Sequence, residues 1–560
     1  MRDVLVGEVW ICSGQSNMEW KLSQVDPQRD GDPPTDLPRI RLLTITNAPR
    51  LGRQDELEGR WTPASERSLV AFSAVAGWFG RALHRELGVP IGLICNAWGG
   101  TRIQTWISRE ALLQDPLGRT EIRHYEGFLD DPTRMAPGEW ASIPDWEARG
   151  APKDTGNRGL SDGWAGPAFD DAGWKTMPMP TQWQQHGHAG SGVFWFRRSV
   201  LVPAAWSGRD LDLGLGAIDK HDETYVNGER VGGMGFEGGP NTWCTPRTYR
   251  VPGRLVPADG SLCIAVRVRS HFHHGGMIGP AVEMRVAPVG ESGGVPLHGP
   301  WRYAVEQDYG VVTVPNTPWG PGNPNSPYIL FDSRIAPLLP YAIRGAIWYQ
   351  GESNAEQPEA YRRLMPLMIR DWRRAWGQGD FPFIQVQLAN FRNQPESPAN
   401  GRWPELREAQ TAALAEPGVG MAVAVDIGDP KDIHPRNKRD VGERLARWAL
   451  AHTYGREVAA SGSLYRDATV EAGGRMRVRF DHGAGLRTRD GAAVGELTIC
   501  GIDRVHHPAE SRIEGDTLLA WSPQVLRPWA VRYAWDDCPM RCNLVNGAGL
   551  PASPFRSDGA

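Results

Sequence analysis

The sequence predicts an α/β protein whose mostly parallel sheet is interrupted by an inserted all-β segment. Strand-like and helical runs alternate over residues 1–125 and again over residues 300–455. Over residues 140–297, short strand-like runs separated by Gly, Pro, Asn and Asp replace the helical periodicity. The chain has 560 residues, too many for a single hydrophobic core, so several domains are expected.

The first part, residues 1–125, contains two predicted strands and one predicted helix. "EVWIC" (8–12) is rich in β-branched and aromatic residues and is expected to form a buried strand. "AVAGWFGRALHREL" (74–87) carries apolar residues at helical spacing, and "VPIGLICNAWGG" (89–100) is a second strand that ends in a glycine pair. Strands that alternate with helices indicate a parallel sheet covered on both faces.

The second part, residues 300–455, repeats this alternation. Strands are predicted within 341–353, 381–391 and 418–429. A long amphipathic helix is predicted over 359–377, and another over 438–455 places four residues on one face: Val441, Leu445, Trp448 and His452.

The intervening segment has the pattern of an antiparallel sandwich or jelly roll. Its strand-like runs cover 192–202, 210–216, 223–233 and 262–270, and "VNG" (226–228) predicts a tight hairpin turn. Such a domain can be inserted where the two ends of a surface loop lie close together. Residues 456–560 again alternate like strands, which predicts a small β-rich C-terminal region.

Composition restricts the partners. The net charge of −4 and the isoelectric point near 6.4 give no electrostatic reason to expect a nucleic acid or an anionic membrane. No run is apolar enough to span a bilayer, so membrane insertion is not expected. The 24 tryptophans exceed the 14 phenylalanines and the 12 tyrosines, and tryptophan faces stack well on sugar rings. The oligomeric state is left open.

The cysteines and the N-terminus bear on the compartment. Cys538 and Cys542 are close enough to form a small disulfide loop, which would suit an exported protein, and a free pair is the alternative. No basic segment followed by an apolar stretch opens the chain. Since Met1 lies only a few residues before the first strand, removal of an upstream segment is one explanation, and we expect a periplasmic or secreted protein.

Four polar segments follow predicted strands of the α/β parts: "SGQSN" (13–17), "NAWGGTRIQTW" (96–106), "WYQGESN" (348–354) and "DPKDIHPRNK" (429–438). Open α/β sheets bind their ligands at this edge. A hydrolytic serine needs a base, a carboxylate that orients the base, and donors aimed at the oxyanion. These segments offer Ser16 as nucleophile and His434 as base.

The remaining roles have alternatives. Asp432 is the preferred orienting carboxylate, because its two-residue spacing to His434 allows direct contact within one loop, and Asp429 is the second choice. Backbone N–H groups of Ser16 and of Gly100 or Gly99, with the Gln350 side chain, are candidate oxyanion donors. The structural alternative for Ser16 is a helix cap, and for the glycines an ordinary tight turn.

These same segments carry a family resemblance. "GEVWICSGQSNM", "NAWGGTRIQTWIS", "GAIWYQGESNA", "LREAQ" and "DIHPRNK" occur in the order found in the sialate O-acetylesterase family, within the SGNH or GDSL-like hydrolases. The resemblance implies a flavodoxin-like fold and an esterase that removes O-acetyl groups from sugars through an acetyl-serine, without metal or other cofactor. It assigns Ser16, His434, Gly100 and Gln350 to the roles given above. The spacing D-x-H departs from the D-x-x-H of many SGNH relatives, so the orienting acid is the least secure member.

The inserted segment resembles the sugar-binding jelly roll of the β-galactosidase and β-glucuronidase family, through "FDDAGWKTMPMP", "GVFWFRRSVLVP" and "DETYVNGERVGG". This layout resembles the bacterial xyloglucan acetylesterase group. The insert is expected either to bind glycan or to shape the rim of the active site. "SHFHHGG" (270–276) matches no standard zinc spacing, so no metal site is predicted there.

The leading hypothesis is an O-acetylesterase for plant-type oligosaccharides such as xyloglucan or xylan. The first alternative is a sialate O-acetylesterase, whose substrate carries a carboxylate and needs an arginine such as Arg102 or Arg407 in the pocket. The second alternative is a carbohydrate-binding protein without activity, against which the intact Ser16, Gln350 and His434 argue. Trp98 and Asn354 are further candidates for substrate contacts.

Overall fold

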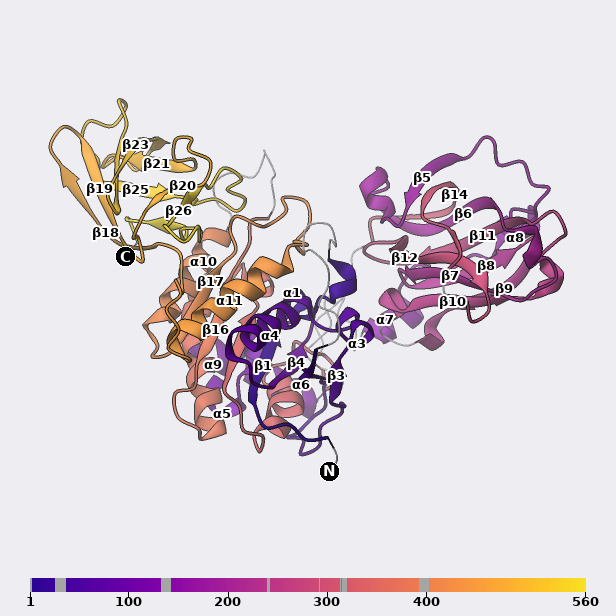
Figure 1. Cartoon of the computed structure of the whole chain (residues 1–560), viewed down its shortest axis with the longest axis horizontal. Coiled ribbons are helices and arrows are strands. Elements are labelled where there is room, and N and C mark those ends of the chain that lie inside the picture. The colour runs from indigo at the N-terminus through magenta and orange to yellow at the C-terminus, as the bar shows by residue number, and fades with distance from the viewer. Residues whose placement is uncertain are drawn as a thin grey trace. The chain divides into compact units, whose positions relative to one another are not determined.

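The computed structural model describes residues 3–25, 37–131, 143–238, 242–291, 293–312, 314, 320–391 and 402–559. The chain divides into two compact units, Met1–Thr133 with Trp319–Ala560, and Arg134–Pro318. The first unit contains the sheet that the two α/β parts of the sequence predict, together with the C-terminal β-rich region. The predicted boundary near residue 300 is wrong, because residues 299–310 form a strand that pairs within the second unit. Figure 1 shows both units and labels their elements.

A seven-stranded sheet organises the first unit, in the order β17-β16-β15-β1-β4-β2-β3. All neighbouring pairs are parallel except β2 with β3. The predicted parallel sheet is therefore confirmed, and its central pair β1–β15 joins the two parts of the chain. The strands are β1 (Glu8–Gly14), β2 (Leu37–Thr44), β3 (Thr62–Ala64), β4 (Ile91–Ala97), β15 (Gly345–Tyr349), β16 (Phe383–Gln387) and β17 (Val419–Val423).

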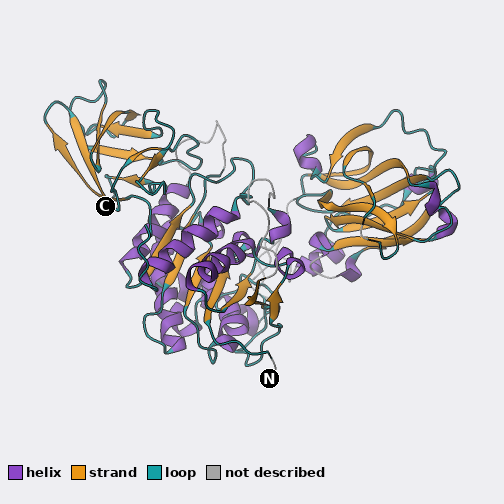
Figure 2. Cartoon of the chain, viewed as in Figure 1, coloured by secondary structure: helices purple, strands orange, loops and turns teal. Residues whose placement is uncertain are grey.

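Helices cover both faces of this sheet (Figure 2), which is why every residue of β4, β15, β16 and β17 is buried. Helix α4 packs against α11, and α9 packs against α10. The helices of the first unit are α1 (Ser16–Glu19), α3 (Glu66–Val70), α4 (Ala74–Leu87), α5 (Arg109–Leu112), α6 (Pro116–Asp130), α9 (Pro358–Trp376), α10 (Trp403–Ala412) and α11 (Lys438–His452).

Local sequence sets the ends of the longer helices. The Ser73 side chain accepts a hydrogen bond from the Ala76 backbone N–H and so caps α4, while Gly88 ends the helix in the left-handed region at φ +68°. Asn437 caps α11 by accepting from the backbone N–H of Asp440. The Asn437 cap fixes where α11 begins. This start follows directly after the segment that carries His434.

The C-terminal region of the first unit is built of short antiparallel strands, as its sequence predicts. Its core includes Met421 and Val423 of β17 and the following Val425, so the region packs against that end of the parallel sheet. The strands are β18 (Leu464–Glu471), β19 (Arg475–Asp481), β20 (Arg487–Thr488), β21 (Leu497–Cys500), β22 (His506–Pro508), β23 (Glu510–Glu514), β24 (Thr517–Trp521), β25 (Ala530–Tyr533), β26 (Leu544–Val545) and β27 (Phe555–Arg556).

The second unit contains two antiparallel sheets, β5-β14-β6-β11-β8-β9 and β10-β7-β12-β13, which share one apolar core. Asn227 and Gly228 both have positive φ, +49° and +87°, and connect β8 to β9, as the Asn-Gly pair predicts. The elements are α7 (Ile143–Arg149), α8 (Arg158–Ser161), β5 (Lys175–Met179), β6 (Ser191–Leu201), β7 (Leu211–Ile218), β8 (His221–Val226), β9 (Glu229–Met234), β10 (Pro246–Val251), β11 (Ser261–Ser270), β12 (Met277–Pro288), β13 (Val295–Pro296) and β14 (Gly299–Gly310).

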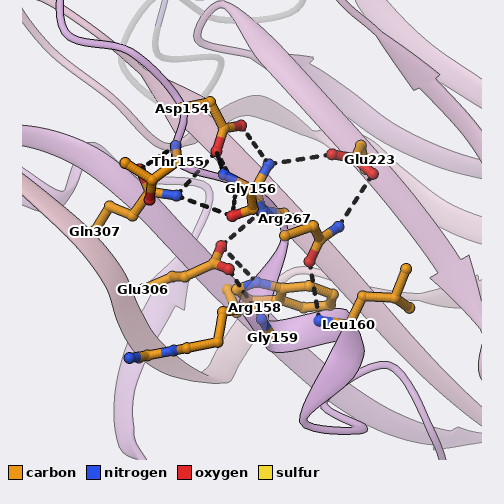
Figure 3. Close-up of polar contacts among 12 residues, drawn as sticks. Asp154, Thr155, Gly156, Arg158, Gly159, Leu160, Glu223, Arg267, Glu306 and Gln307 are labelled. Carbon is orange, nitrogen blue, oxygen red and sulfur yellow. Dashed lines mark hydrogen bonds and ion pairs between the residues drawn. The ribbon is translucent and has the colours of Figure 1, made fainter.

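Arg267 on β11 holds the loop that contains Asp154 and Gly156 against the outer face of the larger sheet (Figure 3). Its neighbours Val266 and Val268 belong to the core between the sheets, so the alternation along the strand turns Arg267 to the opposite face. There its guanidinium pairs with Glu306 at 2.6 Å and with Asp154 at 2.8 Å. The Glu306 side chain is only 1% exposed, so Arg267 is the cation that offsets the burial of its carboxylate.

Replacement of Arg267 by alanine should destabilise the second unit by about 3–5 kcal/mol, because it leaves a buried carboxylate without its countercharge. Denaturant unfolding of the whole chain, with hydrogen exchange of the β11 and β14 amides, measures the loss. Arg254→Ala is the control, since that arginine pairs with Glu229 through two exposed side chains and should matter little. Equal losses for both variants would contradict this account of Arg267.

Candidate active site

Ser16 lies at the end of the central strand β1, beside the end of β15. A Cβ on Gly14 would lie 2.1 Å from the Tyr349 carbonyl oxygen, and the φ of Gly14 is +133°, so only glycine fits this close approach. The next backbone N–H, that of Gln15, donates to the same Tyr349 oxygen at 3.0 Å. The chain then turns into the short helix α1, and Ser16 is left half-buried at the edge of the sheet.

His434 contacts Ser16 from the segment between β17 and α11. Its Nε2 lies 2.9 Å from Ser16 Oγ, which is hydrogen-bond distance for a base that takes the hydroxyl proton. The Trp20 ring stacks on the imidazole at 5.0 Å between centroids, with 17° between the planes. This stacking restricts the rotation of the imidazole, so the base is held in place over the serine hydroxyl.

Asp432 lies beside the other nitrogen of His434. Its Oδ1 accepts the His434 backbone N–H at 2.8 Å and lies 3.6 Å from His434 Nδ1, which is longer than a hydrogen bond. Burial alone would raise the pKa of Asp432, but the side chain and backbone N–H of His434 outweigh it and hold the pKa below its ordinary value. Asp429 instead accepts the backbone N–H of Lys431 at 2.8 Å. The geometry therefore brings Asp432 to the histidine and engages Asp429 in a local turn.

Asn17 ties the serine helix to the histidine segment. Its Nδ2 donates to the carbonyl of Ile433 at 3.0 Å and to Glu352 Oε1 at 2.5 Å, and its Oδ1 accepts from Lys438 Nζ. Burial raises the pKa of Glu352, and Asn17, His434 and Lys438 offset that effect only in part. Because Ile433 precedes His434, the bond from Asn17 fixes the backbone that carries the base.

The sequence gives no prediction of a role for four residues of this site: Asn17, Trp20, Glu352 and Lys438. All four lie within or next to the polar segments that it placed at the strand ends. Their residue types gave no signal for these roles, since an asparagine, a lysine and a tryptophan occur as often in ordinary structural positions. Their convergence on one point depends on the order of the strands.

The glycine turn after β4 lies against Ser16. A Cβ on Gly99 would come within 3.4 Å of Ser16 Cβ, and the Gly99 N–H donates to Glu19 Oε2 at 2.8 Å. The N–H groups of Ser16 and Gly100 have no acceptor in the part of the chain that the structure describes. Of the two predicted glycine donors, Gly100 is thus the one whose N–H is available.

In this structure the Gln350 side chain is not free to act as the oxyanion donor that the sequence predicts. Its side-chain amide is fully buried and donates to the Thr101 carbonyl at 3.1 Å and to Asn354 Oδ1 at 2.8 Å. Both amide hydrogens are therefore used, and neither is available to an oxyanion in this structure. Through Thr101, Gln350 holds the turn that carries Gly100.

Two of the predicted substrate contacts are wrong. Asn354 is buried, accepts the Ile103 N–H at 2.9 Å and donates to Gln104 at 2.9 Å, so its amide has no free face. Arg407 is completely buried and donates to the carbonyls of Leu388, Ala389, Asp536 and Asp537, which links α10 to the C-terminal region. Burial lowers the pKa of Arg407 to about 10.

The other two predicted contacts lie near the surface but have partners within the protein. Arg102 pairs with Glu121 at 2.8 Å and donates to the Asn325 carbonyl at 3.1 Å. Trp98 is half-buried, with the Arg334 guanidinium over its ring at 4.6 Å. Of these two residues, Arg102 has its charge paired within the protein, and Trp98 remains a candidate for a substrate contact.

The sequence leaves open whether Cys538 and Cys542 form a disulfide, and it predicts no metal site in the histidine-rich segment 270–276. All seven cysteines are free thiols, so the Cys538–Cys542 loop is not a disulfide in this structure. His271, in the segment 270–276, is buried and pairs with Glu147 at 2.8 Å. Among the described residues, no group of three or more His, Cys, Asp or Glu side chains has the arrangement of a metal site. No described helix is long and apolar enough to cross a membrane.

Replacement of Asn17 by alanine should slow covalent labelling of Ser16 by a fluorophosphonate at least about tenfold, because the base segment loses its tie to the serine helix. Labelling rates followed by mass spectrometry measure the effect. Asn47→Ala is the matched control, since Asn47 is also buried and its side chain bonds only to the backbone of residues 56 and 58. Equal labelling rates for the Asn17 variant and the unmodified protein would show that Asn17 positions nothing.

Known proteins are similar to this chain over both parts of the parallel sheet. The family model described as "Carbohydrate esterase, sialic acid-specific acetylesterase" matches residues 6–127 and 315–451, the two stretches that build the parallel sheet and its helices. Mouse sialate O-acetylesterase is 24% identical over 99% of this chain and 78% of its own length. The human sialate O-acetylesterase is 29% identical over 41% of this chain and 49% of its own length.

Among solved structures, a carbohydrate acetylesterase from Xanthomonas citri matches all of this chain and 82% of its own, with a TM-score of 0.60 and 25% identity. The matched segments contain Ser16, His434 and the glycine turn that lies against the serine. Through these segments the chain is similar to the sialic acid-specific acetylesterase family of carbohydrate esterases, and the comparisons support an esterase.

Proposed function

We propose that this esterase hydrolyses O-acetyl esters on plant-type oligosaccharides such as xyloglucan or xylan, with Ser16 as nucleophile, His434 as base and Asp432 as orienting acid. The observation that carries the proposal is the 2.9 Å contact between Ser16 Oγ and His434 Nε2 at the edge of the parallel sheet. A serine hydroxyl is a weak nucleophile until a positioned base accepts its proton.

The first half of the reaction acylates Ser16. As His434 Nε2 takes the hydroxyl proton, Ser16 Oγ attacks the acetyl carbonyl carbon, and the carbonyl π electrons move to its oxygen. When the carbonyl re-forms, the bond to the sugar oxygen breaks and that oxygen takes the proton from His434. The products are the deacetylated sugar and acetyl-Ser16.

The second half repeats these steps with water. His434 takes a proton from water, whose oxygen attacks the acetyl-serine carbonyl, and collapse of the intermediate returns the proton to Ser16 and releases acetate. Asp432 favours the tautomer with hydrogen on Nδ1 and stabilises the imidazolium through charge, across 3.6 Å in the free enzyme. The contact can shorten in the acylation step, when the imidazole becomes positive.

The backbone N–H groups of Ser16 and Gly100 are the proposed oxyanion donors. Both lack an acceptor among the described residues, and the Gly99–Gly100 turn lies against Ser16. Such donors stabilise negative charge most when the protein fixes them in advance. Gln350 supports this by holding Thr101, the residue that follows Gly100.

The positions of the two candidate arginines, Arg102 and Arg407, support a neutral sugar at the active site. Recognition of a sialic acid carboxylate needs a guanidinium at the pocket. Arg407 lies in the interior and Arg102 pairs with Glu121, so neither supplies one. The Xanthomonas citri relative is named a carbohydrate acetylesterase, without restriction to sialic acid.

Hydrolysis of O-acetyl sialic acid is the second candidate, and one observation favours it. Arg436 is exposed and its guanidinium lies over the Trp20 ring at 5.9 Å, on the same ring that stacks on His434. A sialate carboxylate can pair with Arg436 there. The curated mouse and human relatives carry the name sialate O-acetylesterase.

The second unit and the location complete the proposal. We propose that residues 134–318 form a jelly roll that binds glycan or shapes the rim of the active site, which their two antiparallel sheets with a shared core support.

We place the enzyme in the periplasm or outside the cell, because a polysaccharide does not cross a bilayer intact.

The enzyme should release acetate from acetylated xyloglucan or xylan oligosaccharides, as measured by mass spectrometry of an oligosaccharide panel that also contains O-acetyl sialic acid. Ser16→Ala should lower the rate by several orders of magnitude, because the serine and histidine act as one unit. Exclusive hydrolysis of O-acetyl sialic acid, lost in Arg436→Gln, would replace the first candidate by the second. Full activity of the Ser16 variant would remove this serine from the mechanism.

The orienting acid has its own test. Asp432→Asn should reduce kcat far more than it changes KM, because charge near Nδ1 stabilises the imidazolium of the transition state. Asp429→Asn is the matched control three residues earlier in the chain, and it should be milder since, among the described residues, Asp429 accepts a hydrogen bond only from the Lys431 N–H. Small losses for both variants would indicate a Ser16–His434 dyad, and a large loss confined to Asp429→Asn would show the assignment to be wrong.

A further inference from the structure

We propose that a basic hollow between α4 and α11 binds the carboxylate of an acidic sugar residue, such as a hexuronic acid, in the glycan that the enzyme deacetylates. The hollow has a volume of about 50 Å³ and is lined by Trp78, Arg81, Ala82, Arg85, Arg439 and Glu443. None of these is a residue of the Ser16 site. The nature of the sugar rests on the proposed function, and the affinity for a carboxylate does not.

A close helix crossing brings the lining together. A Cβ on Gly442 of α11 would lie 2.7 Å from Trp78 Cβ and 2.7 Å from the Val75 carbonyl oxygen of α4. Glycine at this position therefore lets the two backbones approach each other. The crossing sets Arg439 and Glu443, which lie one turn apart on α11, alongside Arg81 and Arg85, one turn apart on α4.

The hollow has an excess of positive charge. Three guanidinium groups and one carboxylate line it. Glu443 pairs with Arg439 at 3.1 Å, and Arg85 pairs with Glu86 at 2.9 Å through exposed side chains. Arg81 has no hydrogen bond or ion pair among the described residues. Burial, followed by repulsion from Arg439 and Arg85, lowers the pKa of Arg81, so a bound anion would relieve an existing repulsion.

Trp78 holds two of these cations in place. The Arg81 guanidinium lies 5.0 Å from the indole ring and that of Arg439 lies 5.3 Å from it. Trp78 is only 4% exposed, and its indole N–H is buried with no acceptor among the described residues. The ring is therefore fixed by packing, and cation–π contacts orient both guanidinium groups before any ligand arrives.

The size and surroundings of the hollow indicate a carboxylate attached to a sugar. A volume of about 50 Å³ accepts a carboxylate but not a pyranose ring. A second, shallow and mainly apolar depression shares Trp78 and is lined also by Leu22, Leu69, Ser73, Ala74 and Gly77. The hollow therefore takes only the carboxylate, and the sugar ring attached to it lies outside the hollow.

Titration calorimetry of the whole chain with sodium D-glucuronate, against D-glucose as the uncharged counterpart, tests the proposal. Glucuronate should bind, and glucose should not. Arg81→Gln should weaken glucuronate binding at least about tenfold, the loss expected for one charge-assisted contact. Arg504→Gln is the matched control, because that arginine also lies 5.0 Å from a tryptophan ring, Trp529, outside this hollow. The Arg504→Gln variant should bind glucuronate as tightly as the unmodified protein does.

Further arms separate this proposal from the catalytic one. Arg81→Gln should hydrolyse 4-nitrophenyl acetate at the normal rate, and Ser16→Ala should bind glucuronate normally. N-acetylneuraminate in place of glucuronate shows whether a sialic acid occupies the same hollow. Absence of glucuronate binding, unchanged binding by the Arg81 variant, or equally tight binding of inorganic phosphate would overturn the acidic-sugar site, whatever the outcome for Ser16.

Discussion

The parallel pairing of β1 with β15 is the interaction on which the active site depends. It joins two parts of the chain that the second unit separates, and it aligns Gly14 with Tyr349 in register. Because all the parallel strands end at one edge, this pairing puts the segments after β1, β4, β15 and β17 together. Ser16 and His434, 418 residues apart, meet for this reason.

Neutral side-chain amides hold the loop that follows β4 near Ser16. Gln350, Asn354 and Gln104 bond to one another and to the backbone around Thr101 and Ile103. Burying amides costs little when each hydrogen bond is made, whereas charges in the same place would require countercharges. Asn17, likewise a neutral amide, bonds to both Glu352 and Lys438.

The two units have separate apolar cores, and this explains how one chain accommodates both. The core around the parallel sheet and the core between the antiparallel sheets have no residue in common. A long insertion adds only a slowly growing entropic cost to closing the β1–β15 pairing, provided that it folds on its own core. Arg267 and its carboxylates serve the second unit alone, since all their partners lie within it.

The sequence by itself determined the strands, the helices and the order of the polar segments. Apolar periodicity placed α4 at residues 74–87 and β1 at the strand before Ser16, and the Asn-Gly pair predicted the β8–β9 turn. These are local signals, which depend on side-chain spacing and on the few residues that accept positive φ. They also sufficed to propose Ser16 and His434 as nucleophile and base, and the structure brings these two side chains into contact.

Only the tertiary structure decided which side chains are free to act. Arg407, Asn354 and Gln350 have residue types suited to binding, yet folding buries them and commits their side-chain N–H groups to internal partners. It also gives Asp429 and the Gly99 N–H local hydrogen-bond partners, whereas Asp432 lies beside His434 and the Gly100 N–H has no acceptor among the described residues. Burial and hydrogen-bond satisfaction are properties of the packed whole, so no spacing in the sequence specifies them.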